Sequence, residues 1–173
     1  MSPARNQAMN ERATIFLGLG SNVDPEANLR LAIRELQRRF GDLTVSSVYR
    51  SAAMGFDGDD FLNLVVSMQS NCSALCVCES IELIHNLAGR QRSSNKWEAR
   101  PLDIDLLLYN DQIIDEPPVR VPRSDVLEYS FVLRPLAEIA PDLKHPVTGR
   151  SMLEHWKEFD AASHPMERVD VRL

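Results

Sequence analysis

The chain has 173 residues and a mass of 19.6 kDa, about the size of one domain. Hydrophobic residues make up 44% of it and charged residues 25%, proportions that exclude a chain disordered throughout. The formal net charge of −6 repels a nucleic-acid backbone, so an anionic ligand must meet a locally basic segment. No apolar run approaches the length of a membrane-spanning helix, and the first residues lack the apolar core of a signal peptide. We therefore expect a cytoplasmic protein that binds neither nucleic acid nor a membrane.

The first half of the chain alternates strand-like and helix-like patterns. Residues 1–12 are polar and aperiodic, which predicts a disordered tail. Residues 14–20 predict a strand that stops in a tight loop. A helix follows, with Asp24 as its cap, Pro25 in its first turn and Gly41 at its end.

Two further strands are expected at residues 43–49 and 61–68. The segment between them, residues 51–60, contains two glycines and is long for a hairpin, which predicts a mobile flap. Ser73 begins a second helix that ends at Gly89.

Three cysteines lie close together in this second helical segment: Cys72, Cys76 and Cys78. Their odd number favours a reducing compartment over a disulfide framework. Cys72 and Cys76 would share one face of the helix, but no histidine or second cysteine pair accompanies them at a metal-ligand spacing. We expect small buried or half-buried side chains and no metal or redox site.

Residues 102–109 predict a strand, and residues 112–115 are expected to pair back onto it through a turn at residues 110–111. Short helices are expected near residues 131–139 and 150–158.

The order strand, helix, strand, strand, helix, strand predicts an α+β fold. We expect a ferredoxin-like βαββαβ sandwich, with a mainly antiparallel sheet, helices packed on one face and a C-terminal helical extension. This single domain is assigned to residues 13–160, and residues 161–173 to a C-terminal tail.

Asp103 and Asp105 form the strongest local signal, because they alternate with leucine and isoleucine. A strand sends residues two apart to the same face, so both carboxylates point one way, with Cα atoms about 6–7 Å apart. The plainer interpretation is a solvent-facing side of the strand. Against it, aspartate is rare in strands, like charges repel, and the same face continues with Leu107 and Tyr109, which need cover. A divalent cation would relieve the repulsion, and carboxylate oxygens suit Mg²⁺.

Just upstream, four basic residues fall within eleven positions, with Glu98 as the one acid among them: Arg90, Arg92, Lys96 and Arg100. By itself such a segment is most often a solvated loop. Beside a carboxylate pair it favours a polyphosphate site, because arginine and Mg²⁺ together neutralise the charge that moves in phosphoryl transfer. Trp97 could stack on a base, although burial of hydrophobic area is the simpler role.

Other catalytic motifs are absent from the sequence. GLGSN lacks the spacing of a dinucleotide-binding loop, and no P-loop, GxSxG or HExxH motif occurs. The four histidines are scattered without metal-ligand spacing: His85, His145, His155 and His164.

Five segments taken in order resemble motifs of the 6-hydroxymethyl-7,8-dihydropterin pyrophosphokinase family: GLGSNVDPEANL, VSSVYRS, DDFLNLVV, GRQRSSNKWEARPLDIDLLLY and FVLRPLAEIAP. The resemblance covers about residues 13–158, and its most specific part runs from Gly89 to Asp105. It implies transfer of pyrophosphate from ATP to the hydroxymethyl oxygen of the pterin, with release of AMP, in folate biosynthesis. ATP and 6-hydroxymethyl-7,8-dihydropterin are the implied partners, and we expect a monomer.

The resemblance also implies roles for individual residues. Two Mg²⁺ ions would lie on Asp103 and Asp105, bridging the phosphates and approaching the attacking hydroxyl. The implied catalytic residues are Arg90, Arg100, Asp103 and Asp105. The implied ATP-binding residues are Arg90, Arg92, Trp97, Arg100, Leu106 and Arg123. The implied pterin-binding residues are Ser51, Met54, Phe61, Asn63 and Phe131, with Asn63 on the polar edge of the ring and the two phenylalanines as apolar walls. Loops 51–60 and 89–100 would close over both substrates and exclude water.

Four departures from the family pattern stand out. Arg123 replaces a histidine that contacts ATP, Tyr129 stands where a basic residue is frequent, and His85 replaces a common glutamate. Glu98 and Ala99 replace the Gly-Pro that precedes Arg100.

These departures motivate a second hypothesis, a catalytically weakened paralogue that binds a pterin or nucleotide as a sensor. A third, an unrelated two-metal phosphodiesterase, is disfavoured because the aspartate pair has no histidine–aspartate ligand array beside it.

Overall fold

A computed structural model describes residues 11–89 and 101–173 of the chain. Its strands are β1 (Ala13–Ser21), β2 (Leu43–Val45), β3 (Val48–Ser51), β4 (Phe61–Ser70), β5 (Asp103–Tyr109), β6 (Ile114–Glu116), β7 (Val119–Val121) and β8 (Met166–Val169). Its helices are α1 (Pro25–Phe40), α2 (Ala74–Leu87), α3 (Asp125–Glu128), α4 (Ser130–Ile139) and α5 (Met152–Glu158). The main sheet has the order β5-β1-β4-β3-β8, with β2 also paired to β4, and all its pairings are antiparallel.

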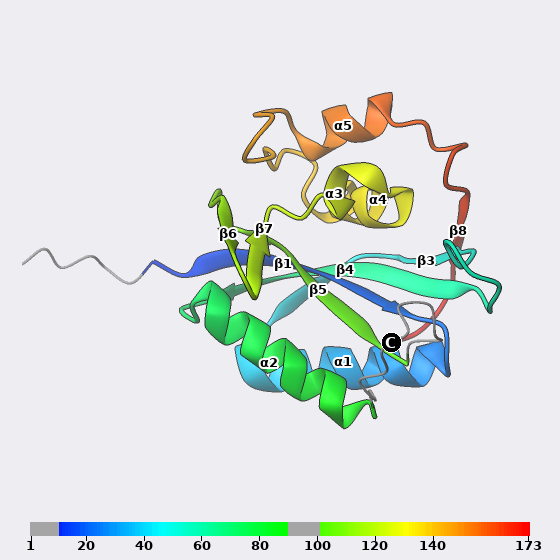
Figure 1. Ribbon diagram of the computed structural model, residues 1–173, viewed down its shortest axis with the longest axis horizontal. Coiled ribbons are helices and arrows are strands. Elements are labelled where there is room, and N and C mark those ends of the chain that lie inside the picture. The colour runs from blue at the N-terminus through cyan, green and yellow to red at the C-terminus, as the bar shows by residue number, and fades with distance from the viewer. Residues whose placement is uncertain (1–10, 90–100) are drawn as a thin grey trace, which may run out of the picture.

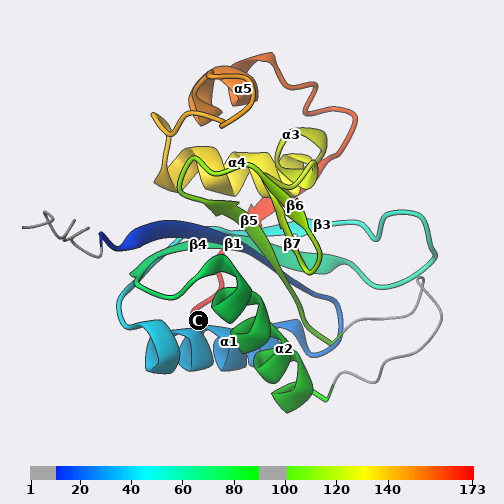
Figure 2. The same ribbon diagram turned by 60° about the vertical axis from the view of Figure 1, so that its left-hand side comes forward.

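Helices cover both faces of this sheet (Figure 1). α1 and α2 lie on one face, while α3, α4 and α5 lie on the other, which Figure 2 shows from the side. Neighbouring strand residues serve different layers, because their side chains alternate: Leu17 packs with the α1–α2 layer and Phe16 with the α4 layer. The α+β fold is therefore confirmed, and the C-terminal helices add a second layer on the opposite face of the sheet.

The helix ends partly match the sequence pattern. Ser73 caps α2 by accepting a hydrogen bond from the Cys76 backbone N–H, and Gly41 ends α1 with a φ of 84°. Asp24 occupies the N-cap position as expected, but its side chain makes no capping bond. Its backbone instead adopts a left-handed conformation with φ 40° and accepts the Asn28 N–H through the carbonyl oxygen.

The expected strand at residues 43–49 is split into β2 and β3 by two serines. The Ser46 hydroxyl accepts a hydrogen bond from the Val65 N–H, and the Ser47 N–H and hydroxyl both donate to Glu138 of α4. These side-chain contacts replace part of the regular ladder, so the strand bends at this point.

The expected pairing of residues 112–115 with β5 was also wrong, because β6 pairs with β7 in a separate hairpin. Asn110 follows β5 with φ 49°, and its side chain accepts a hydrogen bond from the Thr14 N–H of β1. Asn110 is thereby fixed to β1, and the chain leaves the main sheet. At the other end of the protein, the segment treated above as a C-terminal tail contains β8, which extends the sheet beyond β3.

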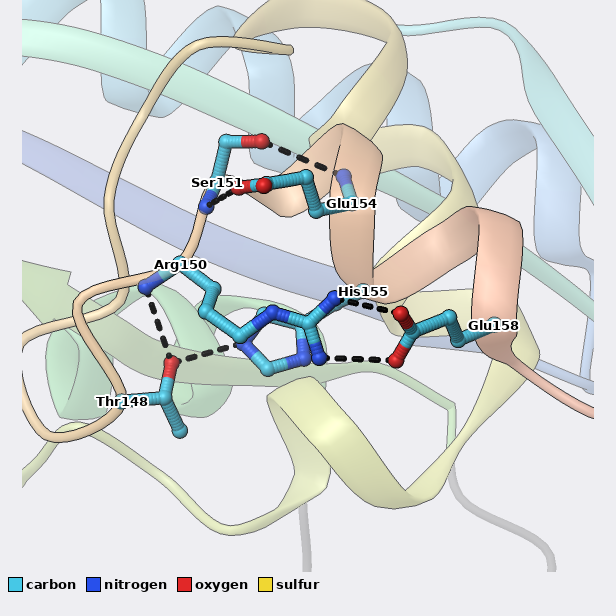
Figure 3. Close-up of polar contacts among 6 residues, drawn as sticks. All are labelled: Thr148, Arg150, Ser151, Glu154, His155 and Glu158. Carbon is cyan, nitrogen blue, oxygen red and sulfur yellow. Dashed lines mark hydrogen bonds and ion pairs between the residues drawn. The ribbon is translucent and has the colours of Figure 1, made fainter.

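α5 begins at Met152 because Ser151 and Glu154 form a reciprocal cap (Figure 3). Each side chain bonds to the backbone N–H of the other residue, at 3.2 Å and 2.7 Å. Arg150 and Glu158 add an exposed bidentate ion pair across the helix.

The structure joins Cys72 and Cys76 in a disulfide, with Cα atoms 5.7 Å apart, and leaves Cys78 as a free thiol. The expectation of small unlinked side chains was therefore wrong for the first two. Cys72 precedes the cap residue of α2 and Cys76 lies in the first turn, which brings their sulfur atoms together. Burial and the nearby Glu82 and Glu79 carboxylates raise the pKa of the Cys78 thiol. Within residues 11–89 and 101–173, no helix is long and apolar enough to cross a membrane.

Candidate active site

A cavity of about 490 Å³ opens on the α3–α4 side of the main sheet. All five residues implied above for the pterin line it: Ser51, Met54, Phe61, Asn63 and Phe131. Asp103, Asp105 and Arg123 line the same cavity. The structure thus brings together residues from four separate segments of the sequence.

Asp103 and Asp105 both face this cavity from β5, as the strand period predicts. The partners of these two residues on β1 are Gly20 and Gly18. Because glycine has no side chain, β1 leaves an opening beside the carboxylates, bordered by Leu107 next to Gly18 and by Asn63 next to Gly20. This opening suits a bound ion with its phosphate ligands better than a packed strand face.

The face that carries the aspartates does not continue as expected. Leu107 lines the cavity, but Tyr109 packs into the core on the α1–α2 side, where its hydroxyl donates to the Cys72 carbonyl over 2.7 Å. The cause is an irregularity in the β1–β5 pairing between Phe16 and Leu17, which shifts the strand by one residue.

Arg123 approaches the aspartate pair from the segment after β7. One of its Nη atoms lies 3.6 Å from Asp105 Oδ1, and Nε and the other Nη contact Asp125 Oδ2 at 2.9 Å and 2.7 Å. Burial lowers the pKa of the guanidinium, but the carboxylates of Asp105 and Asp125 outweigh this effect and raise it. Arg123 is therefore a fixed positive charge at the mouth of the site.

Asn63 is buried on β4 with a fixed orientation. Its Nδ2 donates to the Ser51 hydroxyl over 2.9 Å. A Cβ added at Gly20 would lie 3.0 Å from Asn63 Oδ1, so only glycine leaves the carboxamide in place. The asparagine can then present a donor and an acceptor to a flat heterocycle without reorganising.

Two aromatic pairs border the cavity. Phe56 contacts Phe61 edge to face at 6.2 Å, and Tyr129 stacks on Phe131 at 5.1 Å. The sequence reasoning missed Phe56 and Asp125, because neither forms part of a periodic pattern or charge cluster. It considered Tyr129 only as a lost basic residue, whereas the ring supports the Phe131 wall.

Several residues that the family resemblance implies for ATP binding do not line the cavity or lie outside the described part of the chain. Arg90, Arg92, Trp97 and Arg100 lie outside the described residues. Leu106 is described and only 6% exposed, but it packs in the core on the α1–α2 side and does not line the cavity. The alternation of β5 accounts for this, since Leu106 follows Asp105 and points to the opposite face.

The carboxylate pair fits Mg²⁺ by its donor chemistry. Among residues 11–89 and 101–173, no group of three or more metal-ligating side chains occurs. Mg²⁺ is commonly bound by one or two carboxylates, with phosphate and water completing its octahedron. Two aspartates beside an open glycine strand match that requirement.

Residues 16–141 match the family model described as 7,8-dihydro-6-hydroxymethylpterin-pyrophosphokinase. The chain is 34% identical over 144 residues to the 2-amino-4-hydroxy-6-hydroxymethyldihydropteridine pyrophosphokinase of Aquifex aeolicus, covering 82% of this chain and 89% of that protein. The enzyme of the same name from Haemophilus influenzae is 33% identical over 161 residues, covering 91% of this chain and 98% of the relative.

The chain belongs to this pyrophosphokinase family. It is an ATP-dependent diphosphotransferase of folate biosynthesis, and it moves pyrophosphate from ATP to 6-hydroxymethyl-7,8-dihydropterin. Among solved structures, wild-type Plasmodium falciparum HPPK-DHPS matches with a TM-score of 0.70 and 13% identity, over 86% of this chain and 45% of that one. At this identity the match shows the shared fold, and this chain spans less than half of that structure.

Proposed function

We propose that the pyrophosphokinase reaction takes place in the cavity between β5 and α4, with Asp103 and Asp105 as the ligands of two Mg²⁺ ions. The observation that carries the proposal is a single row across three strands, in which Asn63 pairs with Gly20 and Gly20 pairs with Asp103. The row places a group suited to a pterin and a group suited to a metal on the two sides of one glycine.

The pterin would lie between Phe61 and Phe131, which line the cavity from β4 and α4. The Asn63 amide already donates one N–H to Ser51, so its second N–H and its Oδ1 can pair with the polar edge of the ring. This arrangement orients the hydroxymethyl group of the substrate along the row toward Asp103.

On the phosphate side, Asp103 and Asp105 would hold the magnesium ions and Arg123 would contact phosphate oxygens. Bound Mg²⁺ supplies charge neutralisation of the triphosphate and a lower proton affinity of the substrate hydroxyl. Arg123 replaces a histidine, and its planar guanidinium can form two parallel hydrogen bonds to a phosphate. Arg90, Arg92, Trp97 and Arg100 are assigned to ATP by the family resemblance, with Arg90 and Arg100 as catalytic groups.

The loop of residues 51–60 is proposed to cover the substrates. The described structure ties it to the end of β1 at one point, where Asn22 Nδ2 donates to the Asp59 carbonyl over 3.4 Å. Met54 and Phe56 of this loop line the cavity. Closure would exclude water that could otherwise hydrolyse ATP.

We further propose that the protein acts as a monomer in the cytoplasm. ATP and the pterin are intracellular metabolites, which supports the cytoplasm as the compartment of the reaction.

A coupled assay for AMP with ATP, Mg²⁺ and 6-hydroxymethyl-7,8-dihydropterin tests the proposal. AMP should form only when the pterin is present, together with one equivalent of pterin diphosphate. If both substrates bind and no pterin-dependent AMP is produced, the chain is the weakened binding module that the sequence departures suggested.

A further inference from the structure

The peptide that joins Asp103 to Ile104 lies at the outer edge of the main sheet. β5 pairs with β1 on one side only, so within the described chain the N–H groups on its other side have no strand partner. One of them, the Ile104 N–H, donates to Nε2 of His85 on α2 over 2.9 Å. Both residues are buried, each with 3% of its surface exposed. A buried N–H needs an acceptor, and here a side chain supplies it.

The contact also determines the state of the imidazole ring. Since Nε2 accepts a hydrogen bond, the ring is neutral and its proton lies on Nδ1. Nδ1 is 3.2 Å from the Glu82 Oε1 atom, one turn earlier on α2. The carboxylate therefore selects the tautomer and orients the ring, and a chain of contacts runs from Glu82 through His85 to the strand.

Ile104 is the residue between the two carboxylates. Its own side chain packs into the α1–α2 core, whereas Asp103 and Asp105 face the cavity. The other side of the strand is held by the ladder to β1, in which Asp103 pairs with Gly20 and Asp105 with Gly18. His85 thus completes the support of this peptide from the side that the sheet leaves open.

We propose that His85 is a positioning residue for the metal-binding carboxylates. By holding the Ile104 N–H, it keeps the backbone of β5 in the place from which both carboxylates face the cavity, where they would hold Mg²⁺. The inference rests on the proposed function, because it takes Asp103 and Asp105 as the Mg²⁺ ligands. Residues that orient metal ligands are commonly worth about 10-fold to 100-fold in metal affinity or activity.

Nuclear magnetic resonance of the ¹⁵N-labelled full chain tests the contact itself. A scalar coupling across the hydrogen bond should link the Ile104 amide nitrogen to His85 Nε2, and the ring ¹⁵N shifts should be those of the Nδ1–H tautomer. Absence of the coupling, or a proton on Nε2, overturns the proposal.

The consequence for the metal site is measured by Mn²⁺ binding in the presence of α,β-methylene-ATP, followed by water proton relaxation. His85→Leu removes the acceptor at similar volume and should weaken Mn²⁺ binding by about 10-fold to 100-fold. His85→Gln and His85→Glu each carry an acceptor near the position of Nε2, and at least one of them should recover most of the affinity. kcat should fall with Mn²⁺ affinity in His85→Leu, while KM for the pterin stays near the wild-type value.

Val77→Ala is the matched control, because Val77 is fully buried on the same helix and does not contact β5 through a hydrogen bond. It should lower the melting temperature without changing Mn²⁺ affinity. If His85→Leu behaves in the same way, or if neither acceptor-bearing variant recovers binding, the role is structural and the proposal is wrong. Asp103→Asn distinguishes a failure of the His85 proposal from a failure of the metal site. If this variant leaves Mn²⁺ affinity unchanged, the metal site itself is misplaced and both proposals are wrong.

Discussion

Asn63 and Asp103 lie on one row of the main sheet with only Gly20 between them. Adjacent strands are about 4.8 Å apart, so the two Cα atoms are separated by about 10 Å. That distance leaves room for a flat ring at one end and a metal-bound phosphate at the other. The row also makes Gly20 a position where a single added carbon affects the site.

Gly20→Ala should raise KM for the pterin by about tenfold, because the new Cβ would lie 3.0 Å from Asn63 Oδ1 and force the carboxamide to turn. Gly18→Ala is the control for the pterin KM alone, since its Cβ would meet Leu107 at an ordinary 3.4 Å and lies beside Asp105, away from Asn63. Steady-state kinetics with saturating ATP would measure both. Equal values of KM in the two variants would contradict the role assigned to Gly20.

Asp103→Asn should lower kcat by about 100-fold or more, because one metal ligand loses its charge. The melting temperature measured without Mg²⁺ should change little, since the variant removes both the repulsion between neighbouring carboxylates and a weaker attraction to Arg123. Asp105→Asn should lower kcat similarly, but it also loses the attraction to Arg123 at 3.6 Å and gains no stability. Asp111→Asn, an exposed change in the turn after β5, should match the wild type in both measurements. A fully active Asp103→Asn variant would remove the metal assignment.

Arg123→Ala should raise KM for MgATP by about tenfold and leave KM for the pterin unchanged, because the guanidinium faces the carboxylate end of the cavity. Arg123→Lys should give an intermediate value, since an ammonium group lacks the fork that binds two phosphate oxygens. Arg120→Ala provides the control, because Arg120 and its partner Asp115 are exposed. The prediction fails if the pterin KM changes as much as the ATP KM.

Tyr49 and Glu138 should make stability depend on pH at both extremes. The Tyr49 hydroxyl donates to Glu138 Oε2 over 2.6 Å. Burial, followed by the hydrogen bond that the Tyr49 hydroxyl donates to Glu138, raises the pKa of Tyr49 to about 12. Burial raises the pKa of Glu138, but the hydrogen bonds from Tyr49 and Ser47 outweigh it and lower the pKa below 4.5.

The directions of these two pKa shifts determine how the stability of the fold changes with pH. The contribution of the Tyr49 proton to the free energy of unfolding is fully present below pH 10 and is lost as the pH rises through about 12. The contribution of the Glu138 charge is present above pH 4.5 and is lost as the pH falls through its lowered pKa. Tyr49→Phe should therefore lower the free energy of unfolding by about 1 kcal/mol at pH 7 and by less at either extreme of pH. Urea unfolding at each pH measures this difference. A cost independent of pH would contradict the pairing, and the Tyr49 absorbance should titrate near pH 12 in the wild type.

Much of the site was predictable because its signals are local. The alternation around Asp103 and Asp105 determines that both point to one face, and a strand period requires no knowledge of the partner strands. The apolar spacing of α1 and α2 likewise determines which of their faces is buried. Tyr109 marks where this reasoning ends, because a one-residue irregularity in pairing reversed its face.

The amino-acid order by itself therefore determined the element types as far as β5, the two carboxylates on one strand and the motif set that identifies the family. Only the tertiary structure decided that Arg123 pairs with Asp105 and Asp125, that Phe56 meets Phe61, and that His85 accepts the Ile104 N–H. The physical reason is that the face of a helix or strand to which a side chain points depends on residues only a few positions away in the sequence. A contact between elements depends on the registers, turns and strand irregularities of the whole fold.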